Sequence, residues 1–146
     1  ISIEHLPKDF ESRFDYVIAN PPFHKKTGTR STNRHRNLAC IGDGSLLSDW
    51  LKNAVWACKS KGYVSFMIRA DRIDEVISFL NSQKMGEITL YPIWPVQGNP
   101  ANRIIVTARK DSKTGSILLP GITLHNTDGS LTSNASLAMS GLGIER

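Results

Sequence analysis

The chain has 146 residues, a mass of 16.2 kDa and a net charge of +5, which is enough for one domain around one hydrophobic core. Its 40% hydrophobic and 21% charged residues argue against disorder along the whole length, and no stretch approaches the roughly 18 consecutive apolar residues of a membrane span. With two cysteines and no signal peptide at its start, the chain is expected to be cytoplasmic, and the missing initial methionine predicts that it is part of a longer protein.

The first predicted element is a buried strand at residues 14–20, a largely apolar run that Pro21 and Pro22 end because proline lacks a backbone N–H. Residues 24–44 then predict a polar loop, of a length that is usually functional. From His24 to Gly42 this loop has no acidic residue and five basic ones: Lys25, Lys26, Arg30, Arg34 and Arg36. A polyanion such as nucleic acid is the natural partner, although a solvated basic loop accounts for the charge equally well.

An amphipathic helix is predicted from Leu46, because apolar residues recur at three- and four-residue spacing as far as Cys58. The preceding Gly42-Asp43-Gly44 is interpreted as a lead-in to this helix rather than as a cofactor loop. Gly62 is expected to end the helix, with the nearby lysines, Lys59 and Lys61, complementing its C-terminal dipole.

Residues 63–68 predict a second buried strand, after which Arg69 either faces a ligand crevice or forms a surface ion pair. Asp71 is the expected N-cap of a second helix, whose apolar face extends over residues 73–80. Gly86 is expected to close that helix.

A third strand is predicted at residues 87–94, and Pro92 and Pro95 favour an edge position for it. Residues 103–109 predict a fourth strand, joined to the third by a short loop. Strands that alternate with helices predict an α/β fold with a mostly parallel sheet, here with an antiparallel final strand pair. Two short strands, at residues 117–119 and 122–125, and a loosely held tail after Leu131 complete the prediction.

The residues with the clearest chemical meaning are Asn20-Pro21-Pro22-Phe23, directly after the first strand. The Asn20 amide oxygen and the Pro21 carbonyl could accept both hydrogens of an –NH2 group, and Phe23 could stack on a planar ring. Two acceptors held by rigid prolines would favour a pyramidal nitrogen with a free lone pair, and positioning would then supply much of the rate. The plainer alternative is a Pro-Pro strand end followed by an aromatic residue that packs. The histidines show no ligand spacing, so no metal site is predicted.

Residues 14–23 resemble motif IV of the amino-directed S-adenosylmethionine methyltransferases. The stretch from Gly98 to Val106 is similar to the Gly-x-Pro-Ala-x-Arg stretch of bacterial tRNA1(Val) adenine-37-N6 methyltransferases, and residues 124–129 are similar to the tail of that family. The resemblance implies an S-adenosylmethionine-dependent enzyme that methylates adenine N6 in tRNA. It implies catalytic roles for Asn20, Pro21, Pro22 and Phe23, cofactor contact by Asn20, base stacking by Phe23, and phosphate binding by Lys25, Lys26, Arg30, Arg34 and Arg36.

One departure from this family concerns the cofactor site. Class I methyltransferases have a glycine-rich loop after their first strand and an acidic residue at the end of the second, and this chain has neither. The resemblance therefore implies the C-terminal half of a Rossmann-like class I sheet. Residues 1–110 would be the C-terminal portion of the catalytic domain, and residues 111–146 its short β and irregular tail.

This half-sheet would leave the first predicted strand with an unpaired apolar edge. We expect a separate N-terminal half or a second copy of the chain to cover it, and we expect the chain alone to bind the cofactor weakly. Other readings remain open: a guanine-N2 rRNA methyltransferase, a protein glutamine-N5 methyltransferase, or a non-catalytic RNA-binding module that lacks the cofactor site. A glycine-rich strand–turn–helix upstream of Ile1 would favour an enzyme over the last of these.

Overall fold

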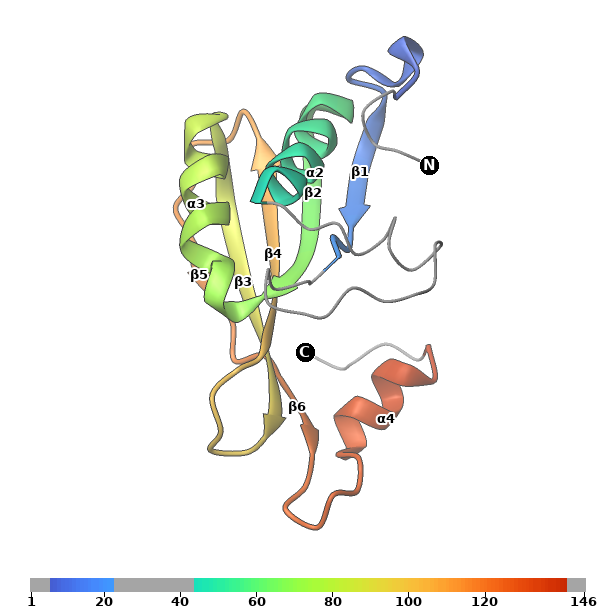
Figure 1. Ribbon diagram of the computed structural model, residues 1–146, viewed down its shortest axis with the longest axis vertical. Coiled ribbons are helices and arrows are strands. Elements are labelled where there is room, and N and C mark those ends of the chain that lie inside the picture. Colours follow the sequence, from blue (N-terminus) through green and yellow to red (C-terminus); the bar gives the residue numbers. More distant parts are fainter. Residues whose placement is uncertain (1–5, 23–43, 142–146) are drawn as a thin grey trace.

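The computed structural model describes residues 6–22 and 44–141. The described residues form six strands, three α-helices and two short 3-10 helices (Figure 1). In chain order they are η2 (Lys8–Phe10), β1 (Phe14–Ala19), α2 (Gly44–Ala57), β2 (Cys58–Arg69), η3 (Ala70–Arg72), α3 (Ile73–Ser82), β3 (Met85–Val96), β4 (Arg103–Lys110), β5 (Ile117–Leu118), β6 (Ile122–His125) and α4 (Ser133–Met139).

The strands form a mixed sheet in the spatial order β1-β2-β4-β3-β5, and β6 also pairs with β3. β1 and β2 are parallel, since α2 lies between them in the chain and provides the crossover. β4 is antiparallel to both β2 and β3, whereas β5 and β6 are parallel to β3. The predicted α/β class, mostly parallel with an antiparallel final strand pair, is confirmed, and the last long strand lies between β2 and β3.

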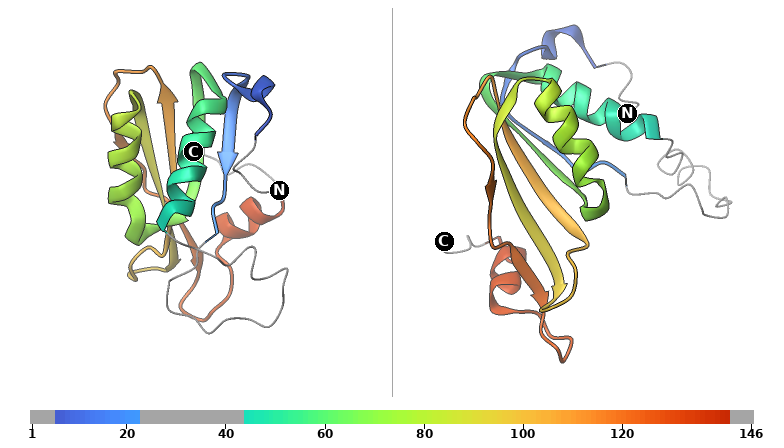
Figure 2. Two further views of the ribbon diagram at one scale, coloured as in Figure 1. Left: turned by 45° about the horizontal axis from the view of Figure 1, so that its top comes forward. Right: turned by 90° about the vertical axis from the view of Figure 1, so that its left-hand side faces the viewer.

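The main core lies between the sheet and two helices, α2 and α3, which cover the same face (Figure 2). Alternate residues of β2 point to this face, and Val64, Phe66 and Ile68 are at most 1% exposed. Val76 and Leu80 of α3 meet them there and are fully buried. The intervening residues of each strand point to the opposite face, on whose side α4 lies beside β6 (Figure 2).

The end of α2 differs from the prediction. The helix ends at Ala57, and Cys58, Lys59, Lys61 and Gly62 belong to β2, so neither lysine lies in the last helical turn and Gly62 does not end the helix. Gly62 has a packing role instead, because a Cβ there would lie 2.8 Å from the carbonyl oxygen of Asp15 in β1. Apolar periodicity did not show where the helix ends, because Cys58 is as buried at the start of β2 as it would be on the apolar face of the helix.

The second helix also has different ends from those predicted. Asp71 lies in η3 and does not cap α3, whose N-cap residue, Arg72, has no side-chain cap bond. The Asp71 carboxylate accepts hydrogen bonds from Arg69 instead. The helix ends at Ser82, and Gly86 lies inside β3, where a Cβ would come within 2.4 Å of the Ser112 carbonyl oxygen.

β3 is not an edge strand, in contrast to the prediction from its prolines. β5 pairs with Thr89 and Leu90, and β6 pairs with residues from Ile93 onward, so Pro92 falls between the two short partners. Both partners fit because neither Pro92 nor Pro95 is a register partner of β5 or β6.

The segment after Leu131 contains a helix where a loosely held tail was expected. Thr132 caps α4, since its Oγ1 accepts a hydrogen bond of 3.1 Å from the Ala135 backbone N–H. The same hydroxyl donates to the Thr123 carbonyl of β6 at 2.6 Å, and Ala135 is fully buried. The cap and the contact with β6 therefore hold a helix whose own sequence is weakly apolar.

Candidate functional site

The site begins where β1 ends. Ala19, the last residue of β1, is 6% exposed and is the register partner of Phe66 in β2. Asn20 follows immediately and is exposed, Pro21 is buried and Pro22 is partly buried. The chain thus leaves the sheet at Asn20, and the buried Pro21 that follows restricts the backbone next to the exposed Asn20 amide side chain.

A polar hollow of about 510 Å³ lies at the adjacent end of β2. Because β1 and β2 are parallel, the residues that follow them emerge at the same edge of the sheet, the edge at which open α/β sheets bind ligands. Six residues line the hollow: Arg69, Ala70, Asp71, Ala101, Asn102 and Arg103. Sequence reasoning singled out Arg69 but missed Arg103, which becomes a candidate only when β4 is known to pair with β2.

Arg69 combines the two alternatives considered for it, because it lines the hollow and is ion-paired. Its Nε donates to one carboxylate oxygen of Asp71 at 2.8 Å, and its Nη2 donates to the other. These hydrogen bonds raise the pKa of the Arg69 guanidinium further above its ordinary value, and the side chain is charged at every physiological pH.

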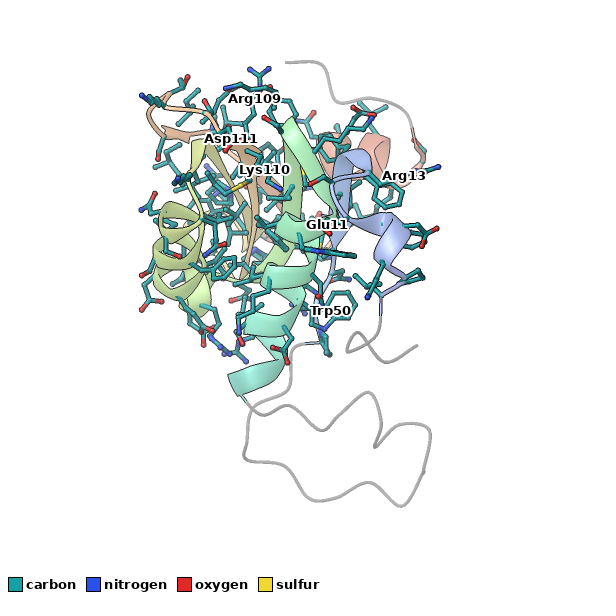
Figure 3. All side chains as sticks on the ribbon, turned by 90° about the horizontal axis from the view of Figure 1, so that it is seen from above. Glu11, Arg13, Trp50, Arg109, Lys110 and Asp111 are labelled. Atoms are coloured by element: carbon teal, nitrogen blue, oxygen red, sulfur yellow. The ribbon has the colours of Figure 1, made fainter. Side chains whose placement is uncertain are left out.

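A second, apolar hollow of about 300 Å³ lies along the outer edge of β1, which pairs with no other described strand, and the side of α2 that faces it. Trp50 lines this hollow, and Figure 3 shows it on the β1 side of α2. Its indole Nε1 is buried and has no hydrogen-bond partner in the part of the chain that the structure describes. Beside it, Ile18 is 77% exposed and Tyr16 is 51% exposed. Trp50 therefore packs against the core and also lines this hollow.

The far face of the sheet has its own aromatic cluster beside β1. The Tyr16 and Tyr63 rings stack with centroids 5.9 Å apart, and the Arg109 guanidinium lies 5.3 Å from the Tyr63 ring centroid. Glu87 accepts a hydrogen bond from the Tyr63 hydroxyl at 3.2 Å and one from Arg109 at 3.4 Å. This cluster ties β1, β2, β3 and β4 together on the face opposite α2 and α3.

Several predicted site residues lie outside the described residues. Phe23 and the five basic residues of the predicted loop are among them: Lys25, Lys26, Arg30, Arg34 and Arg36. Of the predicted catalytic residues, the described chain contains Asn20, Pro21 and Pro22, all at one strand end.

Among the described residues there is no group of three His, Cys, Asp or Glu side chains that could hold a metal ion. The described helices include none long and apolar enough to cross a membrane. At the carboxyl edge, β1 is followed by the two prolines and β2 by η3, so neither of these strand ends opens into a glycine-rich turn.

No family model matches the sequence, and no curated protein matches it either. Among solved structures, the fold is similar to the crystal structure of a predicted O-methyltransferase, protein Atu636 from Agrobacterium tumefaciens, with a TM-score of 0.71 and 24% sequence identity. The similarity covers 92% of this chain but only 55% of that one, so the chain spans about half the length of this structural neighbour.

Proposed function

We propose that this chain is part of an S-adenosylmethionine-dependent N-methyltransferase that acts on an exocyclic amino group, and that its substrate is adenine N6 in tRNA. The observation that carries the proposal is the position of Asn20-Pro21-Pro22, which leaves the sheet directly at the carboxyl end of β1. The fold shared with a predicted O-methyltransferase supports the reaction class.

The choice of nitrogen rests on the number of acceptors. An exocyclic amino group has two hydrogens, and Asn20 and Pro21 together offer two carbonyl oxygens, one from a side chain and one from the backbone. A hydroxyl acceptor has only one hydrogen and would leave one of the two oxygens without a partner. The structural neighbour is described as a predicted O-methyltransferase, whereas the amine acceptor proposed here follows from this chain's own residues.

In this mechanism, Asn20 and Pro21 bind both amino hydrogens and orient the nitrogen lone pair, and the Pro21 ring holds both acceptors in place. When bound, the cofactor supplies an electrophilic methyl group. The amine loses one proton to water after it is methylated, so the mechanism needs no side-chain base. Phe23 would stack on the adenine ring, and the base would leave its stack to reach Asn20.

The described residues suit the acceptor end of the reaction better than the cofactor. Asn20 can contact S-adenosylmethionine, but a glycine-rich turn for its adenosine and methionine groups is not found among the described strand ends at this edge. We therefore propose that a polypeptide segment corresponding to the other half of the structural neighbour supplies the glycine-rich turn and covers the outer edge of β1.

The cofactor proposal predicts that residues 1–146 alone bind S-adenosylmethionine weakly or not at all, because most of the binding residues would belong to the other segment. Isothermal titration calorimetry of the isolated chain with the cofactor measures this directly. Micromolar binding would contradict the division of the site between two segments.

RNA is the proposed acceptor because of the charge distribution. The five basic residues of the segment between His24 and Gly42 equal the net charge of the chain, +5, and no acidic residue lies among them. A protein glutamine would have little use for such a segment, whereas RNA phosphates would bind it. The tRNA assignment over rRNA rests on the resemblance of residues 98–106 and 124–129 to the tRNA enzymes.

The catalytic role of Asn20 is tested by Asn20→Ala in the full-length enzyme, with a radiolabelled methyl donor offered tRNA, rRNA and protein. We expect methyl transfer to tRNA to be abolished and folding to be unchanged, because the Asn20 side chain is exposed. Asn81→Ala, on the exposed side of α3, is the matched control and should keep full activity. Retained turnover in Asn20→Ala would rule out the mechanism. Radiolabel found in protein or rRNA instead of tRNA would show that the proposed substrate is wrong.

A further inference from the structure

A third hollow, of about 410 Å³, lies beside the connection between β3 and β4, and the proposed mechanism makes no use of it. Its lining consists of Trp94, Gln97, Gly98, Asn99, Pro120 and Thr123. None of these six side chains is charged, so the hollow suits a neutral group better than a phosphate. One large aromatic ring and two carboxamides together suit a planar ring that carries polar atoms on its edge.

The indole of Trp94 forms one wall of this hollow. Trp94 is partly buried, and its Nε1 donates to the carbonyl of Pro120, a second lining residue, at 3.2 Å. Thr123 of β6 is the register partner of Trp94 and lies beside it. These contacts hold the indole in one place. A ring that is already fixed in this way loses little conformational entropy when another ring stacks on it.

The two amides come from the turn that follows β3. The Asn99 backbone N–H donates to the Val96 carbonyl at 3.2 Å, and Gly98 adopts a φ of 83°, which favours glycine. The turn fixes the backbone of Gln97 and Asn99, whose side chains are exposed and have no hydrogen-bond partner within the described part of the chain. Each amide therefore has donors and an acceptor to offer a ligand.

This hollow lies at the same edge of the sheet as Asn20. β4 is antiparallel to both β2 and β3, so β3 runs parallel to β2 and β1, and the arrows of β1 and β3 point the same way in Figure 1. In the order of the sheet, β3 follows β1 after β2 and β4, which corresponds to about 14 Å at the usual spacing of strands. An RNA strand whose target base reaches Asn20 can therefore place another base, a few nucleotides away, at Trp94.

We propose that this hollow binds an unpaired nucleobase of the RNA substrate, stacked on Trp94 and hydrogen-bonded by Gln97 and Asn99. This inference rests on the proposed RNA substrate. Single-stranded RNA is commonly recognised by aromatic side chains that stack on its bases and by hydrogen bonds to the base edges. The base bound here is not the one that is methylated, so these three residues position the substrate and select its sequence without taking part in the reaction.

The test measures binding of the chain to a fluorescently labelled single-stranded oligoribonucleotide of mixed sequence, over a range of potassium chloride concentrations. Trp94→Leu should weaken binding about tenfold, because the contact with one stacked base is lost. The log–log salt slope should stay the same, because no phosphate contact is lost. Trp94→Phe keeps an aromatic ring but loses the Nε1 hydrogen bond, and it should weaken binding about threefold or less.

Asn99→Ala tests the amide without removing an intramolecular hydrogen bond of its side chain. It should weaken binding about threefold to tenfold and leave the melting temperature unchanged. Asn81→Ala is the matched control, because it also removes an exposed amide, but from α3 and not from the hollow, and it should leave the affinity unchanged. Heparin, a polyanion without bases, should bind the wild type and Trp94→Leu equally.

Thermal melting of the Trp94 variants separates stacking from a structural role. If Trp94→Phe and Trp94→Leu weaken RNA binding equally and their melting temperatures fall equally, the indole N–H stabilises the protein and the ring does not bind a base. Adenosine monophosphate provides a second probe. If it quenches the indole fluorescence of the wild type more than that of Trp94→Phe while all variants bind RNA equally, the hollow binds free nucleotides, which overturns the assignment to RNA.

The remaining outcomes separate this inference from the function on which it rests. If the wild type binds the oligoribonucleotide with a steep salt dependence and the Trp94 and Asn99 variants bind it equally well, the base site is wrong and the RNA substrate stands. If the wild type binds no RNA, the RNA substrate is wrong and the base site falls with it.

Discussion

Cys58 lies at the point where α2 ends and β2 begins, and its thiol is fully buried. Burial raises the pKa of this thiol, because the thiolate would lose its hydration. The Lys110 ammonium opposes the shift by stabilising the thiolate, and the Asp15 carboxylate adds to it to a smaller extent. The folded state therefore favours the neutral thiol more strongly than the unfolded state does.

This shift predicts a pH dependence of stability. The contribution of the neutral Cys58 thiol is fully present below the thiol pKa of the unfolded chain, about 8.5, and is lost as the pH rises through the higher pKa of the folded state. The difference in the free energy of unfolding between wild type and Cys58→Ala should be constant up to about pH 8 and shrink above it. Urea unfolding from pH 7 to pH 10 measures this, and a difference that stays constant to pH 10 would refute the burial argument.

For single residues, the sequence predicted which side chains are buried better than it predicted what those side chains do. Cys58 was expected on an apolar stripe and is buried, but it belongs to a strand. Arg103 could not be identified as a site residue, because its importance comes from facing Arg69 across a strand pair that no local pattern reveals. Likewise Asp71 has the spacing of an N-cap, yet the guanidinium of Arg69 competes successfully for its carboxylate.

The C-terminus of α2 is stabilised by another element of the fold. The Lys110 ammonium, at the end of β4, donates to the Val55 carbonyl at 2.8 Å and to the Cys58 carbonyl at 2.7 Å. Figure 3 labels this side chain between β4 and the helix. A cation at this position satisfies carbonyls that have no partner within the helix and complements the helix dipole.

Removal of this ammonium group should therefore loosen the end of α2. Lys110→Met keeps most of the aliphatic side chain and should lower the free energy of unfolding by about 1.5 to 3 kcal/mol, because two carbonyls lose a charged donor. Lys59→Met is the matched control, since the Lys59–Asp15 pair is exposed and should contribute less than about 1 kcal/mol. Urea unfolding measures both variants. An equal decrease in the free energy of unfolding would show that the two Lys110 hydrogen bonds stabilise the protein no more than an exposed ion pair does.

Elements with strong apolar patterns could be predicted, and elements held by distant contacts could not. β1, β4 and β6 lie within a residue of their expected bounds, because each is a compact run of apolar and β-branched residues. α4 was missed, because Thr132 and its contact with β6 stabilise it more than its own sequence does. From the sequence, the lysines next to α2 were expected to complement its dipole. In the structure Lys110 does so, about fifty residues further along the chain.

For the molecule as a whole, the main feature is that β1 lies at the end of the sheet, with no described strand paired to its outer side. Charged or proline residues usually protect such an edge, but β1 has a single charge, on Asp15, which Lys59 already binds. Ile18 is largely exposed there and lines the apolar hollow together with Trp50. In the absence of the proposed companion segment, this edge is available to a second copy of the chain.

We therefore expect the isolated chain to self-associate through β1. Ile18→Lys should shift it toward a 16.2 kDa monomer in sedimentation velocity without lowering its melting temperature, because the side chain is 77% exposed. Met139→Lys removes an equally exposed apolar residue, 74% exposed on α4, and should leave the association unchanged. A wild-type chain that is already a stable monomer without any companion would contradict this proposal.

The topology also bears on the order in which the sheet assembles. The β3–β4 hairpin closes over residues 97–102, whereas β1 meets β2 only after the chain returns from residues 20–57. Closing a short loop costs less chain entropy than closing a long one, so the hairpin and its pairing with β2 should form before β1 docks. The strand that precedes Asn20 is then the last to join the sheet and the first to leave it. Whatever pairs with its free side would hold the candidate site in its final geometry.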